Sequence, residues 1–277
     1  MRNFMLALPV ALSAAFETCE SKPNIITHTP DAIMSFELKK KGDIQVRGSY
    51  TNHGTTIGDD MPLNKITGAD VQAAVAITNR VGIQAYGAFR KEQNGYPPET
   101  GSGTRHKHTY TRNGGGGAIV YFTPLNAKAS LFFSGSAGLG TAQYSANIYK
   151  ETNGGPTHFF NNQVNKAFLS GNLYQQLGVF SYGIGVRYSS IGYSHFATNY
   201  SALQLETEGL NKLYHNRANY LDGHIRLGAT FPQLPWLTFE GQITAGGDMS
   251  STVRYSNGYI LSGGVRLNLD KLGGKGK

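Results

Sequence analysis

Charge, tryptophan and cysteine are all scarce in this sequence of 277 residues. Charged residues make up 15% of the chain, against about 25% in a typical soluble protein. A single cysteine excludes a disulfide within the chain, so cysteine usage indicates no redox compartment. Beyond the N-terminal segment, no apolar run approaches the roughly 18 residues that a membrane helix needs, which excludes transmembrane helices.

Glycine and aromatic residues are abundant instead. The chain has 36 glycines, 16 tyrosines and 14 phenylalanines, and its glycine share is nearly double the usual value of about 7%. This composition suits a β protein whose outer surface is not bathed in water. The net charge is +8, but lysine and arginine are scattered rather than clustered on one face. We therefore expect no nucleic-acid partner.

The N-terminus has the features of an export signal. In "MRNFMLALPVALSAAFETC", Arg2 precedes a short apolar run that is not long enough for a stable membrane anchor. Cleavage near Ala15 and cleavage before Cys19 are both compatible with the pattern, and the second would leave a lipidated cysteine. We expect an export signal over 1–18, lipidation at Cys19, and a periplasmic segment over 19–41.

Period-two alternation recurs along the rest of the chain. In "FSYGIGVRYSS" (180–190), aromatic and aliphatic residues occupy one parity while small and polar residues occupy the other. Side chains alternate between the two faces of a strand, so each such segment is expected to have one apolar and one polar face. We expect about ten strands, within 42–50, 69–78, 81–90, 108–122, 129–140, 165–174, 180–190, 220–231, 237–245 and 259–269.

The connections between these segments alternate in length. Tight turns rich in Pro, Asn and Gly join the second strand to the third, the fourth to the fifth, and so on, while longer polar stretches join the others. In an antiparallel meander, this places all tight turns at one end and all long loops at the other. An even strand number with that asymmetry is typical of a bacterial outer-membrane barrel. We expect an all-β, up-and-down transmembrane barrel over 42–270 and a flexible basic tail over 271–277.

A soluble, lipocalin-like barrel is the competing architecture, because it would turn the apolar parity inward. Its outer parity should then be rich in Lys and Glu, whereas the polar parity here holds mainly Ser, Gly, Thr, Gln and a few Arg. That composition favours a crowded lumen, with the apolar parity facing lipid. Aromatic girdles are expected near the strand ends: Phe122, Phe180, Phe231 and Trp236 toward the tight turns, and Tyr50, Phe89 and Tyr193 toward the loops.

The polar parity predicts a charged lumen. A charge inside a narrow barrel is unfavourable unless it is paired, which favours a network of ion pairs that fills the interior. A narrow passage with a basic excess, selective for small anions, is the alternative; a general porin is not expected from only ten strands. The lumen residues are Arg47, Asp70, Gln72, Gln84, Arg90, Arg187, Asp222, His224, Arg226, Glu240, Gln242 and Arg266.

Three residue pairs resemble fragments of functional sites. They are His106 with His108 for a metal, Asp59 with Asp60 for a barrel protease, and Ser194 with His195 for a barrel lipase. None has a recognisable surrounding motif, and no third metal ligand is identifiable. We therefore expect no enzymatic activity, no metal and no cofactor.

The last strand carries a second kind of pattern. In "SGGVRLNL", Ser262, Gly264, Leu267 and Leu269 match the spacing of the signal that the outer-membrane assembly machinery reads, although a terminal aromatic residue is missing. The expected partners are therefore the lipid bilayer and this machinery, together with an unidentified protein partner.

Four segments also resemble a group of outer-membrane β-barrel (lipo)proteins from Bacteroidetes. They are "CESKPNIITHTP" (19–30), "ADVQAAVAITNRVGIQAYGAF" (69–89), "HKHTYTRNGGGG" (106–117) and the final "GGVRLNL". The resemblance implies a barrel in the bacterial outer membrane and implies no activity or ligand. The expected role is structural, or partner and ligand binding through the long loops. A narrow channel is the alternative, and a rim hydrolase is the third candidate.

Overall fold

The computed structural model describes most of the chain beyond its N-terminal segment. The described residues are 36–55, 64–96, 106–150, 156–207, 209–215, 217–249 and 259–271. Asp59 and Asp60 and the expected signal with Cys19 lie outside these residues, as does most of the expected C-terminal tail.

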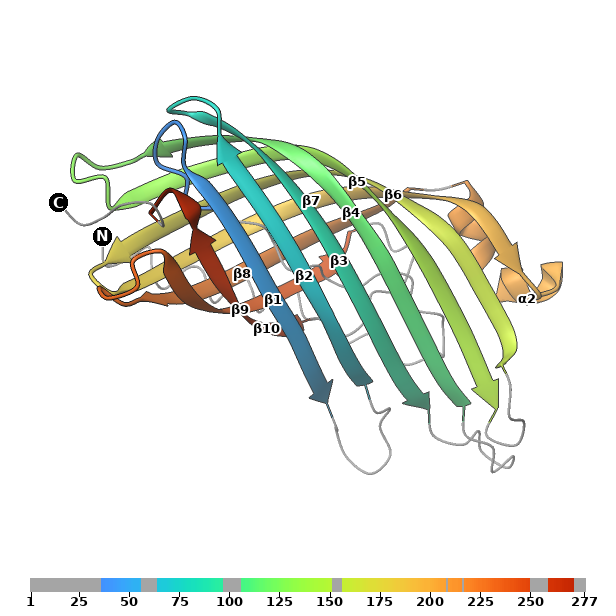
Figure 1. Ribbon diagram of the computed structural model, residues 1–277. Helices are drawn as coiled ribbons and strands as arrows, with labels where there is room; N and C mark the ends of the chain where they lie inside the picture. The colour runs from blue at the N-terminus through green and yellow to red at the C-terminus, as the bar shows by residue number, and fades with distance from the viewer. Residues whose placement is uncertain are drawn as a thin grey trace, which may run out of the picture.

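Ten antiparallel strands close into one barrel (Figure 1). Each strand pairs with its neighbours in the chain, and β1 pairs with β10 to complete the ring. The strands are β1 (Ile44–Thr55), β2 (Asn64–Ala76), β3 (Val81–Tyr96), β4 (His106–Pro124), β5 (Leu131–Lys150), β6 (Pro156–Leu177), β7 (Phe180–Thr198), β8 (Ala218–Thr230), β9 (Leu237–Asp248) and β10 (Tyr259–Asn268). The predicted fold class and strand number are confirmed.

Most strands differ in length from the prediction, and four of them are much longer than a membrane crossing requires. β4, β5, β6 and β7 contain 19, 20, 22 and 19 residues, whereas about nine to eleven residues of tilted strand cross a membrane. The expected end of the fifth strand at residue 140 and the expected start of the sixth at 165 are wrong. Polar residues occupy the outward positions of these extensions, so the alternation that marks a lipid-facing strand disappears there.

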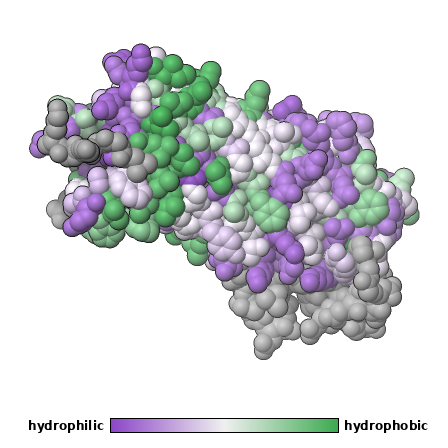
Figure 2. Space-filling view, in the orientation of Figure 1, coloured by the Kyte–Doolittle hydropathy of each residue, from purple (hydrophilic) through white to green (hydrophobic). Residues whose placement is uncertain are grey.

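The apolar parity forms the outside of the barrel. Its exposed side chains gather in a band over the half of the barrel nearer the tight turns, while polar residues cover the half toward α2 (Figure 2). An apolar band on a closed barrel matches the hydrocarbon core of a membrane, because closure leaves no strand edge unpaired in lipid. The band includes Val71, Ile83, Ile119, Leu139, Leu169, Val186, Leu227 and Phe239.

The prediction of outward aromatic girdles is wrong for two residues. Phe122 is 0% exposed and Tyr193 is 8% exposed, and both point into the barrel. Their parity was misjudged within stretches where aromatic residues occur on both faces. Tyr121 and Tyr188 are outward and exposed. Phe180, Phe231, Tyr50 and Phe89 are also exposed, as predicted.

A folded connection packs against one side of the barrel at its long-loop end. Between β7 and β8 lie the helix α2 (Ala202–Thr207) and the 3-10 helix η1 (Leu210–Tyr214). Leu210 and Leu213 are buried in one apolar cluster with inward side chains of β4 to β8, including Tyr193 and Tyr220. These buried apolar contacts hold the connection against the inner side of β4 to β8. Within the described residues, no helix is long and apolar enough to cross a membrane.

Candidate functional site: the charged lumen and the segment that enters it

All the polar residues expected in the lumen lie on the inner face. Each is at most 6% exposed. A water-sized sphere inside an open channel would touch such side chains, so their low accessibility means that no wide aqueous passage runs beside them. The set comprises Arg47, Asp70, Gln72, Gln84, Arg90, Arg187, Asp222, His224, Arg226, Glu240, Gln242 and Arg266.

Two buried ion pairs tie neighbouring strands together. Arg90 on β3 donates from Nη2 to both carboxylate oxygens of Asp70 on β2, at 2.9 and 2.6 Å. Arg187 on β7 reaches Asp222 on β8 with Nη2 at 2.7 Å and Nε at 3.2 Å. Hydrogen bonds between opposite charges compensate for the loss of water around both groups.

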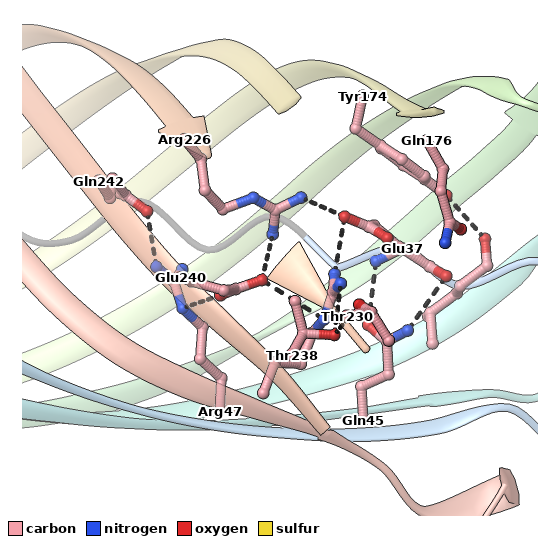
Figure 3. A network of polar contacts seen from close by, with 12 residues as sticks. Glu37, Gln45, Arg47, Tyr174, Gln176, Arg226, Thr230, Thr238, Glu240 and Gln242 are labelled. Atoms are coloured by element: carbon pink, nitrogen blue, oxygen red, sulfur yellow. Dashed lines mark hydrogen bonds and ion pairs between the residues drawn. The ribbon is translucent and has the colours of Figure 1, made fainter. Parts of the chain in front are cut away.

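A larger cluster surrounds Glu240 on β9 (Figure 3). Its carboxylate lies 2.8 Å from Nε of Arg47, 3.5 Å from Nη1 of Arg226 and 3.4 Å from Nε of Arg266. Arg47 also donates from Nη2 to Oε1 of Gln242 at 2.9 Å. These residues come from β1, β8, β9 and β10, so the cluster joins the first and last strands of the barrel at their seam.

The second anion of this cluster comes from outside the barrel wall. Glu37 precedes β1, and its carboxylate lies 2.8 Å from both Nη2 of Arg226 and Nη1 of Arg266. Its backbone N–H donates to Oε1 of Gln45 at 2.9 Å. Glu37 was not predicted as a lumen residue, because alternation identifies strand positions and Glu37 belongs to no strand.

The residues around Glu37 fill the tight-turn end of the lumen. Phe36 and Leu38 are buried with Phe122 and Phe168, and the hydroxyl of Tyr174 donates to the Leu38 carbonyl at 3.0 Å. Residues 36–38, expected in the periplasmic segment, thus lie inside the barrel. We call residues 36–43 the plug segment.

The arginines keep Glu37 ionised. Burial alone would raise the pKa of its carboxyl, but Arg266 and Arg226 outweigh burial and lower this pKa from an ordinary value of 4.5 to about 2. The plug segment therefore remains held by charge at neutral and mildly acidic pH.

The residue pairs considered for catalysis and metal binding form incomplete sites. Nδ1 of His195 lies 3.2 Å from Oγ of Ser194, and both are on the outside of the barrel wall. A Ser–His–Asp type of site needs a further group that orients the imidazole, and no described carboxylate contacts His195. His108 contacts the Tyr110 hydroxyl through Nδ1 at 3.0 Å. No described group of three His, Cys, Asp or Glu residues is placed to bind a metal.

Three residues of the expected assembly signal, Ser262, Gly264 and Leu267, lie in β10. Ser262 faces the interior, and Leu267 is the last outward apolar residue of β10. Leu269 begins the 3-10 helix η2 (Leu269–Lys271), so it follows the strand instead of belonging to it.

A closed antiparallel barrel with an apolar exterior, a charged interior and long connections at one end defines an outer-membrane β-barrel protein. The chain belongs to this class and resides in the bacterial outer membrane.

Solved structures with a similar fold are distant in sequence. The transport unit of the autotransporter AIDA-I from Escherichia coli has a TM-score of 0.48 at 9% identity, covering 86% of this chain and 93% of that one. The translocator domain of the autotransporter NalP from Neisseria meningitidis has 0.43 at 13%, covering 84% and 90%. The outer-membrane protease OmpT from Escherichia coli has 0.40 at 13%, covering 86% and 99%. No protein-family model and no curated protein matches the sequence.

Proposed function

We propose that this protein is a closed outer-membrane barrel with a structural or binding role at the cell surface. The observation that carries this proposal is the low accessibility of the inner face, from the plug segment at one end to Leu210 and Leu213 at the other. A barrel without an open passage does not act as a constitutive channel. We further propose that it is a member of the Bacteroidetes (lipo)protein group that it resembles, lipidated at Cys19.

The projecting end supplies the binding surface in this proposal. β4 to β7 extend well past the apolar band, and α2 and η1 sit at their end (Figure 1). Leu203 of α2 is exposed, while Tyr214 of η1 stacks on Phe196 with ring centroids 4.0 Å apart. Buried contacts to the barrel thus hold an exposed connection in place, which suits recognition of a partner.

Conductance of the purified protein in planar lipid bilayers tests whether the barrel is closed. We expect no steady ion channels at neutral pH, because ion pairs and the plug segment occupy the interior. Steady openings in the unmodified protein would contradict the proposal. Openings with anion preference would instead support the narrow channel, since Arg47, Arg226 and Arg266 outnumber Glu37 and Glu240 in the central cluster.

Replacing Glu37 with glutamine should release the plug segment while leaving the barrel closed at its strands. We expect amide hydrogen exchange to accelerate across 36–43, because the segment loses the ion pairs of Glu37 with Arg226 and Arg266, while the strand amides stay protected. Lys40→Gln is the matched control, since Lys40 is exposed in the same segment. Unchanged protection of 36–43 in Glu37→Gln would show that Phe36 and Leu38 suffice to hold it.

The same segment should resist acid. Because the folded-state pKa of Glu37 is lowered, its stabilising contribution is complete above about pH 4.5 and is lost as the pH falls toward about 2. The protection factor of 36–43, which corrects the exchange rate for its intrinsic dependence on pH, should therefore change little from neutral pH to pH 4.5 and fall below it. Loss of protection already near neutral pH would contradict this assignment. The groups facing Glu37 are Lys39, Tyr174, Arg226, Glu240 and Arg266.

A further inference from the structure

An uncharged polar surface covers the outside of the projecting strands. The strand register aligns its residues in rows across β4, β5, β6 and β7. One row is Asn113, Gln143, Gln163 and Ser194, with Thr111, Ser145 and Asn161 beside it on one side and Thr141 and Asn165 on the other. All are exposed or half-buried. We call these nine residues the amide–hydroxyl face.

The face begins where the apolar band ends. Leu139 and Thr141 are successive outward residues of β5, and the change from aliphatic to polar falls between them. On β7, Tyr188 is an exposed aromatic residue on the band side of the face. Aromatic residues at this level mark the interface between hydrocarbon and headgroups. The face therefore lies at the height of the headgroups of the outer leaflet and just beyond them.

The chemistry of the face is unusual for a water-exposed strand surface. Exposed surfaces generally include many Lys, Glu, Arg and Asp side chains, whereas all nine residues here are amides or hydroxyls. Amides and hydroxyls both donate and accept hydrogen bonds, as sugar hydroxyls do. Contacts within the face already order it: Ser145 donates to Asn161 at 2.6 Å, Gln163 to Thr141 at 3.1 Å and Asn165 to Ser194 at 3.1 Å.

Cations flank the face on both sides. Lys91 of β3 is exposed and is the register partner of Thr111. Beyond β7, the exposed Arg217 donates from Nε to Oγ of Ser190 at 3.0 Å. A ligand that spans the face would therefore meet hydrogen-bonding groups at its centre and positive charge at its edges, which fits a phosphorylated saccharide.

We infer that the amide–hydroxyl face docks the phosphorylated saccharide headgroup of an outer-leaflet glycolipid. Its position beside the apolar band lets one glycolipid place its acyl chains on the band and its sugars on the face. This inference rests on the proposed role of the projecting end as a binding surface, and it names the class of that ligand. The face would anchor the projecting strands to the surrounding leaflet.

Binding of a defined glycolipid to the full-length protein tests this inference. The probe is rough lipopolysaccharide, which carries phosphates and inner sugars, and the comparison lipid is phosphatidylglycerol, which is anionic but has no saccharide. We expect lipopolysaccharide, but not phosphatidylglycerol, to remain bound to the detergent-solubilised barrel in native mass spectrometry. The triple variant Gln143→Ala, Gln163→Ala, Asn165→Ala should bind lipopolysaccharide at least about tenfold more weakly, since several hydrogen bonds are lost.

Control variants distinguish a loss of glycolipid binding from a folding defect, and a separate measurement tests the proposed function. Gln233→Ala changes an exposed amide in the tight turn between β8 and β9 and should leave binding unchanged. A second variant, Asn113→Ala with Ser194→Ala, should weaken binding in the same direction if the triple variant folds poorly. Equal binding of both lipids, or unchanged binding by folded variants, would overturn the inference. Dimers lost in the triple variant would assign the face to a second copy instead. Conductance of the unmodified protein tests barrel closure independently.

Discussion

Replacing Glu240 with glutamine is expected to lower the free energy of unfolding of the barrel by about 3–5 kcal/mol. The substitution keeps the shape of the side chain but removes the anion that lies within 3.5 Å of Arg47, Arg226 and Arg266. Arg47, Arg226 and Arg266 would each lose a contact with a carboxylate, and Glu37 contacts only the last two of them. Denaturant unfolding of the protein in lipid vesicles, followed by fluorescence, measures the change.

A double variant distinguishes lost charge balance from a general packing defect. Arg47→Gln combined with Glu240→Gln removes one cation along with the anion, so it should recover part of the loss seen in Glu240→Gln alone. Glu206→Gln is the matched control, because Glu206 is exposed on α2, and it should stay within about 0.5 kcal/mol of the unmodified protein. Equal stability of Glu240→Gln and the unmodified protein would contradict the assigned role of this cluster.

Gly116→Val is expected to destabilise the barrel by more than about 3 kcal/mol, beyond the usual range for an overpacked side chain. A Cβ at Gly116 would overlap the carbonyl oxygen of Leu139 and lie 2.7 Å from Cα of Gly140 and 2.8 Å from Cε1 of Tyr86. The contact with Tyr86 is to a side chain, whereas the backbone of β5 is fixed by its pairing with β4 and β6. The folded, heat-modifiable form on gels should largely disappear.

Gly241→Val is the matched control for this effect. Gly241 lies on β9 facing outward, and a Cβ there would have no atom within 4 Å. Valine favours extended backbone and an apolar surrounding, so this variant should fold and remain heat-modifiable. If both valine variants folded equally well, close packing between β4 and β5 would not explain the run of glycines.

The fold was predictable because lipid and lumen impose opposite chemistry on alternate residues. β8 shows this most clearly: Leu221, Ile225 and Leu227 are exposed, while the inward residues between them are buried and polar, namely Asp222, His224 and Arg226. A shift of one residue in strand register would place charged side chains in hydrocarbon. The sequence therefore needs an apolar residue at each lipid-facing position. The lengths of the connections then distinguish the two ends of the barrel, since tight turns lie at one end and long connections at the other.

The projecting strands, Glu37 and the connection between β7 and β8 depend on contacts that the period-two alternation does not reveal. Beyond Leu139 the alternation of β5 is inverted: polar residues face outward, while Ala146 and Ile148 face the interior, so the projecting part of the strand lacks the pattern of a lipid-facing strand. Glu37 contributes to the lumen through its contact with Arg226, which is 189 residues away in the sequence. No local sequence pattern predicts such a contact. The burial of Leu210 and Leu213 likewise depends on how the connection folds back over the barrel.

Photolabelling from within the bilayer tests the central claim most directly. A diazirine carried on the lipid acyl chain would be activated around the unmodified protein, and adducts would be located by mass spectrometry. Insertion is expected at the outward Val71, Leu139 and Leu227, with none at the inward Gln72 and Arg226. Adducts on the polar parity, with the apolar parity protected, would contradict a barrel whose apolar face meets lipid.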